Sequence, residues 1–215
     1  MQTKVAALAQ LLMMSEKTVV YSGAGLSAAA GIGTLAGKNA ASLKQSRRTT
    51  DAVPTCTHHA LSALRRMGLL HGWVQQNHDG LPQKAGFPQE AINEVHGSWF
   101  DPSNPVVKFD GMLKQDEGQK MQFEAGTADL VLVVGTSLSG LNADSVASSC
   151  AWRSMSGRNS LGMVIINLQQ TEQDGKASLR VLGKTDLVLL RLLRKLGVPE
   201  PSMRPDVAHG NMKGT

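Results

Sequence analysis

Three runs of consecutive apolar residues constrain the fold of this chain more than any other feature of its sequence. The clearest is DLVLVVGTS, in which the apolar residues 130–134 are followed by Gly-Thr-Ser. TVVYSGAG and GMVIINL, the second apolar over residues 163–166, have the same form. Strands without polar alternation are covered on both faces, which is typical of a parallel sheet between helices. The sequence therefore predicts an α/β protein.

Each predicted strand ends in small or polar residues. Two weaker strand candidates, GWVQQNHDG and EAINEVHG, share this property. In open parallel sheets, ligands bind beyond the carboxyl ends of the strands. We therefore expect the endings GAG, QNHD, HGS, GTS and IN to share one cleft. The predicted architecture is a Rossmann-like open parallel sheet with helices on both faces and a nucleotide site along this edge.

Helices are expected between the strands. The first covers about residues 3–15. A second covers THHALSALRRMG, where Thr57 can cap the helix and Gly68 can end it. The last, TDLVLLRLLRKLG, has leucines at helical spacing, with Thr185 as its cap and Gly197 as its stop.

Length and composition agree with one α/β domain. The chain has 215 residues, enough to bury a sizeable core, and only 4% of them are aromatic. Residues 1–198 are predicted to form the nucleotide-binding domain. The segment that follows has little to bury, so residues 199–215 are predicted to be an extended C-terminal tail.

Charge and cysteine content limit the partners and the compartment. The net charge of +5 favours anionic ligands, but the short basic cluster KQSRRTT is typical of a solvated loop, and no nucleic-acid-binding motif is present. No apolar run approaches the roughly 20 residues of a membrane-spanning helix. Cys56 and Cys150 lack metal-binding spacing and fit a reducing, intracellular compartment, cytoplasmic or nuclear. A mitochondrial location stays open, although the N-terminal segment lacks the arginines of a presequence.

The ordered motifs resemble those of the sirtuins, the Sir2-like NAD-dependent protein deacylases. GAGLSAAAGI resembles the family's GAGxSxxxGI, PTCTHHAL its PTxxHxAL, and QQNHDGLPQKAG its TQNIDxLHxxAG. EVHGS resembles LHGS, VVKFDGML resembles VVFFGExL, VVGTSLSG resembles GTSLxV, and VIIN resembles INxE. Each motif alone is weak, but the ordered set spans about residues 5–198. The resemblance implies the family's fold and NAD as the cofactor.

The resemblance also implies roles for individual residues. His96 would be the base that deprotonates a ribose hydroxyl, a task that suits a group with a pKa near the operating pH. Asn77 and Asp79 would position the ribose and the nicotinamide amide. The residues implied to hold the cofactor are Gly23, Ala24, Gly25, Ser27, Ile32, Gln76, Gly135, Thr136, Ser137 and Asn167.

Glycine spacing separates this chain from ordinary dehydrogenases. Gly23 and Gly25 would let backbone amides approach a pyrophosphate, and the helix start that follows favours negative charge. The spacing is not that of the GxGxxG fingerprint, and no acid follows at the usual distance in a clear strand. A dehydrogenase is therefore the weaker interpretation.

The chain departs from the family pattern in the segment that covers the cofactor and in the zinc module. GIPDFRG is here GIGTLAG, residues 31–37, without its acid, aromatic ring or arginine. This loss affects cofactor orientation and water exclusion. Only SWFDPSNP stands where the family has its paired cysteines, so we expect no metal site. Trp99 and Phe100 would close that side, most simply as core filling.

The substrate and nicotinamide regions differ as well. Phe109, Asp110 and Gly111 stand in place of FGE, near the expected acyl-lysine tunnel. His78 replaces the apolar residue of TQNID, which puts a titratable ring beside the nicotinamide pocket.

Two functions remain open from the sequence. The first is a zinc-free deacylase that transfers the acyl group of a protein lysine to ADP-ribose, or an enzyme that transfers or hydrolyses ADP-ribose. The second is a catalytically impaired NAD-binding or structural subunit of a larger assembly. Retention of His96, Asn77 and Asp79 favours the first. Loss of the lid arginine and of the zinc module favours the second.

Overall fold

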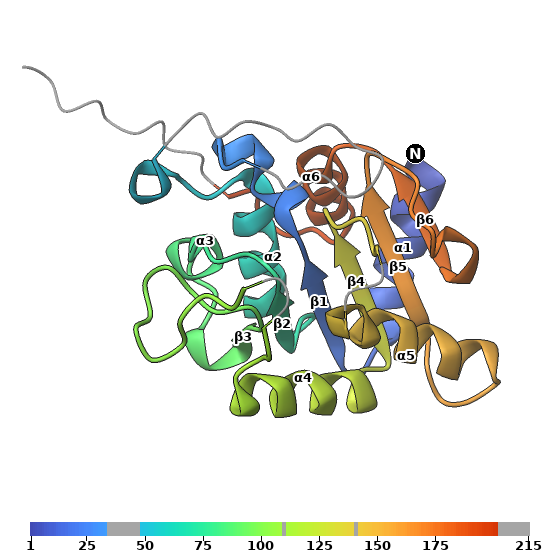
Figure 1. Ribbon diagram of the computed structural model, residues 1–215. Helices are drawn as coiled ribbons and strands as arrows, with labels where there is room; N and C mark the ends of the chain where they lie inside the picture. The colour runs from blue at the N-terminus through green and yellow to red at the C-terminus, as the bar shows by residue number, and fades with distance from the viewer. Residues whose placement is uncertain (34–47, 109–110, 140–141, 202–215) are drawn as a thin grey trace, which may run out of the picture.

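The computed structural model describes residues 1–33, 48–108, 111–139 and 142–201. At its centre lies a six-stranded sheet in the order β3-β2-β1-β4-β5-β6, with all neighbours parallel (Figure 1). The strands are β1 (Thr18–Ser22), β2 (Gly72–Gln75), β3 (Ile92–Glu94), β4 (Leu130–Val134), β5 (Gly162–Asn167) and β6 (Leu179–Leu182). This is a doubly wound order that reverses between β1 and β4. The predicted Rossmann-like parallel sheet is confirmed.

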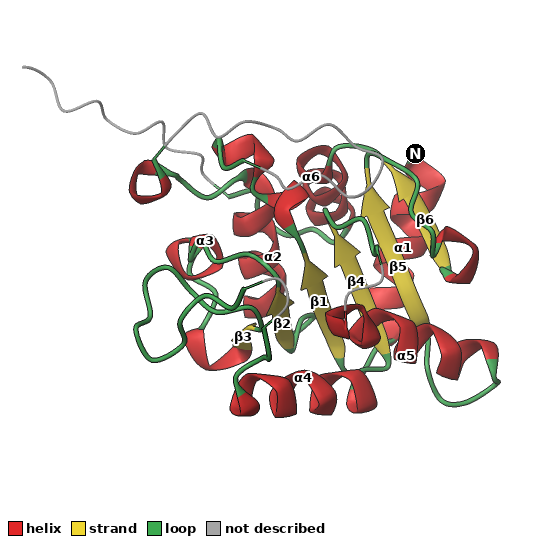
Figure 2. Ribbon diagram, in the orientation of Figure 1, coloured by secondary structure: helices red, strands yellow, loops and turns green. Residues whose placement is uncertain are grey.

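Helices cover both faces of the sheet, as predicted (Figure 2). The α-helices are α1 (Gln2–Met14), α2 (Cys56–Arg66), α3 (Leu81–Lys84), α4 (Gln115–Thr127), α5 (Ser145–Met155) and α6 (Thr185–Lys195). Short 3₁₀ helices lie at Ala24–Leu26, Ala28–Ala30, Thr49–Asp51, Gln89–Ala91, Asn142–Asp144 and Asp174–Lys176. Within the described ranges, no helix is long and apolar enough to cross a membrane.

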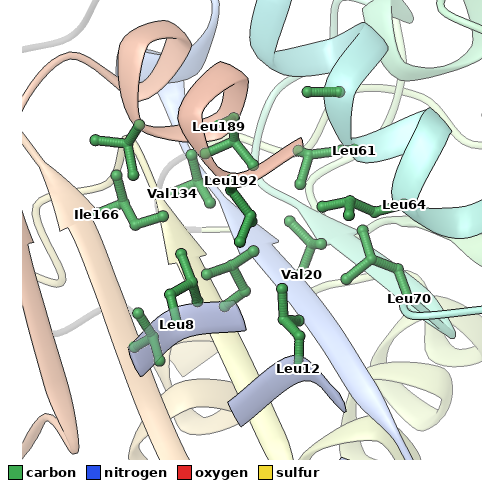
Figure 3. Packing of buried hydrophobic residues seen from close by; sticks show 14 of the residues in the cluster. Leu8, Leu12, Val20, Leu61, Leu64, Leu70, Val134, Ile166, Leu189 and Leu192 are labelled. Carbon is green, nitrogen blue, oxygen red and sulfur yellow. The ribbon is translucent and has the colours of Figure 1, made fainter. Parts of the chain in front are cut away.

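The core is two apolar layers separated by the sheet. Side chains alternate along each strand, so Leu132 of β4 packs with α1, α2 and α6, while Val131 and Val133 pack with α4 and α5. The first layer includes the labelled residues of Figure 3, Leu8, Leu12, Val20, Leu61, Leu64, Leu70, Val134, Ile166, Leu189 and Leu192. Each fully buried leucine stabilises the fold by about 1.5–3 kcal/mol relative to an exposed one.

The start of α2 differs from the prediction. Thr55, not Thr57, is the N-cap, and it forms a capping box with His58, whose Nδ1 accepts from the Thr55 amide at 3.1 Å. The prediction of Thr57 was wrong because its hydroxyl and amide donate to Asp186 of α6 instead. Gly68 follows the helix with φ +73°, so its predicted role as a stop is confirmed.

The start of α6 is also one residue earlier than predicted. Lys184 occupies the cap position without a side-chain cap bond, and Thr185 is the first helical residue. The Thr185 hydroxyl oxygen instead lies 3.0 Å from that of Thr57, which joins α6 to α2. Gly197, with φ +69°, follows the end of the helix as predicted. Residues 202–215 lie outside the described part of the chain, so the boundary at 198/199 stays a prediction.

Candidate functional site

The loops after β1 and β4 touch through their backbones at the point where the strand order reverses. The Gly25 amide donates to the Gly135 carbonyl at 2.8 Å. A Cβ on Gly25 would lie 2.7 Å from that carbonyl oxygen, and one on Gly135 would lie 2.4 Å from the Leu26 nitrogen. Glycine is thus required at both positions for the loops to meet. The Gly25 amide is engaged inside the protein, which differs from its expected use toward a pyrophosphate.

Gly23, Gln76 and Thr136 lie together beyond the carboxyl ends of β1, β2 and β4, the position at which ligands bind in open α/β sheets, and we refer to this position as the crevice. A Cβ on Gly23 would lie 2.8 Å from Thr136 Cβ and 3.2 Å from Gln76 Oε1. Glycine is therefore needed at this position for the Thr136 and Gln76 side chains to approach the backbone as closely as they do. Asn167, at the end of β5, donates from Nδ2 to the Thr136 carbonyl at 3.0 Å. The predicted residues Gly23, Gln76, Gly135, Thr136 and Asn167 therefore meet along one edge.

Ser27, Asn77 and Asp79 form a buried network between the loops after β1 and β2. The Ser27 hydroxyl donates to Asp79 Oδ2 at 2.6 Å and accepts from Asn77 Nδ2 at 3.1 Å. Asn77 Nδ2 also lies 3.1 Å from the Gly23 carbonyl oxygen. Ser27 is 50 positions from Asn77 and 52 positions from Asp79 in the sequence, and the network connects the two loops that carry these predicted residues.

Asp79 is almost fully buried, and its carboxylate is held in one orientation. Oδ1 accepts from the Leu81 amide at 3.0 Å while Oδ2 accepts from Ser27. Burial raises the pKa of Asp79, although these hydrogen bonds and the nearby charges of His78 and Lys84 act in the opposite direction. Each oxygen keeps a lone pair for a further donor.

His96 lies two residues beyond β3, half-buried in a tight turn. Gly97, with φ +87°, closes the turn, and the Val107 amide donates to the His96 carbonyl at 2.9 Å. The pKa of His96 is lowered overall, chiefly by burial. A hydrogen bond to the Gln76 backbone raises the pKa, His78 lowers it, and the charge of Asp144 raises it. The net effect keeps the ring neutral near pH 7, so that it can accept a proton.

His78 joins the two loops that flank His96. Its Nδ1 lies 2.8 Å from the Gly97 carbonyl oxygen, and its own carbonyl accepts from the Trp99 amide at 3.0 Å. The rings of His78 and Trp99 have centroids 5.7 Å apart. The histidine that replaces an apolar residue of the family motif therefore anchors the turn that carries His96.

The segment that replaces the zinc module closes through hydrogen bonds. The Ser98 amide donates to the Asn104 carbonyl at 2.8 Å, and Asn104 Nδ2 donates to the Glu94 carbonyl at 3.1 Å. Trp99 and Phe100 are 43% and 49% exposed, so the prediction that they fill the core was wrong. They cover the loop after β2 instead. The described residues contain no cluster of three His, Cys, Asp or Glu that could hold a metal ion.

Three predicted cofactor residues lie at the margin of this arrangement. Ala24 is half-buried in the 3₁₀ helix after β1, and Ser137 is exposed with its hydroxyl 3.2 Å from Ser139. Ile32 packs in a small satellite cluster with Ala30, Ala52 and Leu81. Residues 34–37 of the lid segment and 109–110 of the substrate segment lie outside the described residues.

Sequence reasoning missed two residues beneath the crevice. Tyr21 of β1 donates to Asp144 Oδ1 at 2.7 Å, and the Gln76 side chain donates to Tyr21. The available signal was a tyrosine in the otherwise aliphatic run VVYS, directly before the glycine loop. A partner 123 residues away carries no local signal in one sequence.

The fold and these strand ends define a doubly wound α/β protein with a ligand site at its switch point. The Sir2 family model matches residues 38–104. The NAD-dependent protein deacetylase SRT1 of Oryza sativa subsp. indica is 28% identical over 259 residues, covering 99% of this chain and 52% of the relative. Human NAD-dependent protein deacetylase sirtuin-7 is 31% identical over 248 residues, covering 93% and 61%.

Solved structures agree with these relatives. One from a study of the mechanism and regulation of Sir2 enzymes has a TM-score of 0.77 and 24% identity, over 92% of this chain and 99% of that one. Another, of Sir2Tm bound to a propionylated peptide, has a TM-score of 0.76 and 22% identity, over 91% and 100%. The chain belongs to the sirtuin family. It spans about half the length of the first curated relatives, 52% and 51%.

Proposed function

We propose that this protein is an NAD-dependent protein-lysine deacylase. It would cleave the nicotinamide–ribosyl bond of NAD and transfer the acyl group of a substrate lysine to ADP-ribose. The observation that carries the proposal is the position of Asn77 and Asp79 after β2 and of His96 after β3, along the strand-end edge where Asn77 bonds the Gly23 carbonyl. Relatives that match nearly the whole chain are named NAD-dependent protein deacetylases, which supports it.

The groups along this edge match the chemistry of NAD. Ribose hydroxyls need acceptors and donors such as Gln76 and Thr136, and a carboxamide NH₂ needs an acceptor such as Asp79. Gly23 leaves room that a side chain would fill. Asn167 would hold the adenosine side, at the end of β5. NAD, when bound, supplies the ribose carbon to which the acyl oxygen bonds as nicotinamide leaves.

His96 would act as the general base. Its ring is neutral near pH 7 and bonded to the Gln76 backbone, so the other ring nitrogen is free to take a proton from a ribose hydroxyl. The turn at Gly97 and the contact of His78 with the Gly97 carbonyl oxygen hold the backbone beside His96 in place. Asn77 and Asp79, fixed through Ser27, would orient the reacting ribose and the nicotinamide amide.

A second candidate is an NAD-binding or structural subunit with impaired turnover, within a larger assembly. The segment 31–37 has lost the acid, aromatic ring and arginine of the family's lid, and this favours it. A cofactor can bind without such a lid, but a reacting carbon exposed to water reacts less selectively.

The location proposed with either function is intracellular, in the cytoplasm, nucleus or mitochondrion. Neither Cys56 nor Cys150 forms a disulfide, as expected in a reducing compartment.

The test is nicotinamide release from NAD with an acetyl-lysine peptide, compared with the same peptide carrying unmodified lysine. We expect release that depends on the acyl group and falls by about 10²-fold or more in His96→Ala. His59→Ala, a histidine change on α2, is the matched control and should retain activity. NAD binding without any release would contradict the deacylase and favour the second candidate.

A further inference from the structure

A buried polar chain lies directly beneath the Gln76–Thr136 crevice. Tyr21, with no exposed surface, donates its hydroxyl proton to Asp144 Oδ1 at 2.7 Å. The phenol oxygen of Tyr21 accepts from Gln76 Nε2, which also lies 3.4 Å from Thr136 Oγ1. Asp144 is 4% exposed, at the N-cap position of α5. A buried carboxylate, a phenol, an amide and a hydroxyl are thus joined between β1, β2, β4 and α5.

We infer that Tyr21 and Asp144 are positioning residues, which orient the Gln76 amide toward the cofactor and provide a fixed negative charge that acts on His96. This inference rests on the proposed function for its link to NAD, but the link to His96 holds in the free protein. Neither residue reaches the crevice itself, so each acts through another side chain.

The orientation of Gln76 follows from proton counting. Tyr21 has one hydroxyl proton, and it is used toward Asp144. The phenol oxygen can therefore only accept from Gln76, so Nε2 must face it and Oε1 must face Gly23 and the crevice. A rotated amide would put two acceptors together. The carbonyl oxygen of Gln76 is thus presented to a ligand hydroxyl, as a ribose requires.

The charge of Asp144 also reaches His96. The ring of His96 bonds the backbone of Gln76, and the Gln76 side chain donates to Tyr21, which donates to Asp144. Burial and His78 lower the pKa of His96, whereas Gln76 and Asp144 raise it. Without Asp144 the base would be weaker, and it would hold the proton of a ribose hydroxyl less well.

The experiment separates charge from hydrogen bonding. Asp144→Asn keeps an acceptor for Tyr21 but removes the charge, whereas Tyr21→Phe removes both bonds of the phenol. Asp186→Asn is the matched control, since Asp186 is also an acceptor at a helix start but lies on α6 and bonds Thr57. Should Tyr21→Phe fail to fold, Tyr21→Phe/Asp144→Leu replaces it, because removal of both partners leaves no unpaired buried charge.

The first readout is the NMR titration of His96 in the protein without NAD, with the signal assigned from His96→Ala. We expect Asp144→Asn to lower the pKa of His96, and Asp186→Asn to leave it unchanged. The second is calorimetric titration with NAD, where Tyr21→Phe should weaken affinity by about tenfold, the effect of one lost oriented hydrogen bond.

An unchanged His96 titration in Asp144→Asn overturns the inference, whatever happens with NAD. Unchanged NAD affinity in Tyr21→Phe overturns the assignment for Gln76. Failure of the unsubstituted protein to bind NAD would refute the proposed function instead, since the histidine titration requires no cofactor.

Discussion

At the scale of single residues, two glycines are required by contact between loops. Gly25 and Gly135 let the ends of β1 and β4 approach until an amide of one bonds a carbonyl of the other at 2.8 Å. The sequence pattern suggested that such glycines serve a bound pyrophosphate. In the structure they first serve the meeting of two strand ends, and the crevice beside Gly23 is a consequence of that packing.

Gly135→Ala should destabilise the protein by at least about 2 kcal/mol, because φ is +62° and the new Cβ would lie 2.4 Å from the Leu26 nitrogen. Urea unfolding measures this change. Gly118→Ala in α4 is the matched control: a Cβ there meets nothing within 4 Å, so alanine should stabilise by about 0.5–1 kcal/mol. Equal stability of the two variants would show that the loops do not touch as described.

At the scale of elements, Asp129 joins the end of α1 to the start of β4. Its carboxylate accepts from the Ser15 hydroxyl and from the amides of Glu16 and Lys17. Burial raises its pKa, but these hydrogen bonds prevail and the net pKa is lowered. A lowered pKa in the folded state means that the contribution is present above the unfolded value of 3.8 and is lost as the pH falls below it.

Asp129→Asn should therefore reduce the free energy of unfolding more at about pH 6 than at about pH 3. Thermal or urea unfolding at both values measures the difference. Glu172→Gln, an exposed change without such bonds, should cost little at either pH. A cost for Asp129→Asn that stays constant or grows with acid would contradict the role of the ionised carboxylate.

The sequence predicts elements well where their pattern is continuous. β1, β4 and β5 are buried along nearly their whole length because both faces are covered, and each contains an unbroken run of apolar residues. α6 has buried residues at helical spacing, Val188, Leu189, Leu192 and Leu193. Sequence analysis did not identify α4, α5 or β6. In α4 two glycines and scattered polar residues mask the buried Met121 and Ala125, and α5 buries mainly small side chains.

The candidate site was predictable only in part. His96, Asn77 and Asp79 follow predicted strands and have a family motif, so their common edge could be inferred. Tyr21 and Asp144 could not be paired from one sequence, since the partners are 123 residues apart. The same holds for Thr57, whose bond to Asp186 of a distant helix overrides its local capping preference.

At the scale of the whole molecule, the doubly wound sheet decides where function can lie. Parallel strands bring the loops after β1, β2, β3, β4 and β5 to one edge of the sheet. The strand order reverses between β1 and β4, and ligands bind at such a reversal in open α/β sheets. The buried networks of Ser27 and of Tyr21 join the loops after β1, β2 and β4. Hydrogen bonds within the protein therefore hold the described part of this edge in place.

The central claim is that this edge binds NAD, and calorimetric titration of the unsubstituted protein with NAD tests it most directly. We expect saturable binding that is competed by ADP-ribose and is weakened in Thr136→Val, which removes a hydroxyl from the crevice. No binding at millimolar NAD would contradict the account, and would mean that the glycine loops of β1 and β4 serve only the fold.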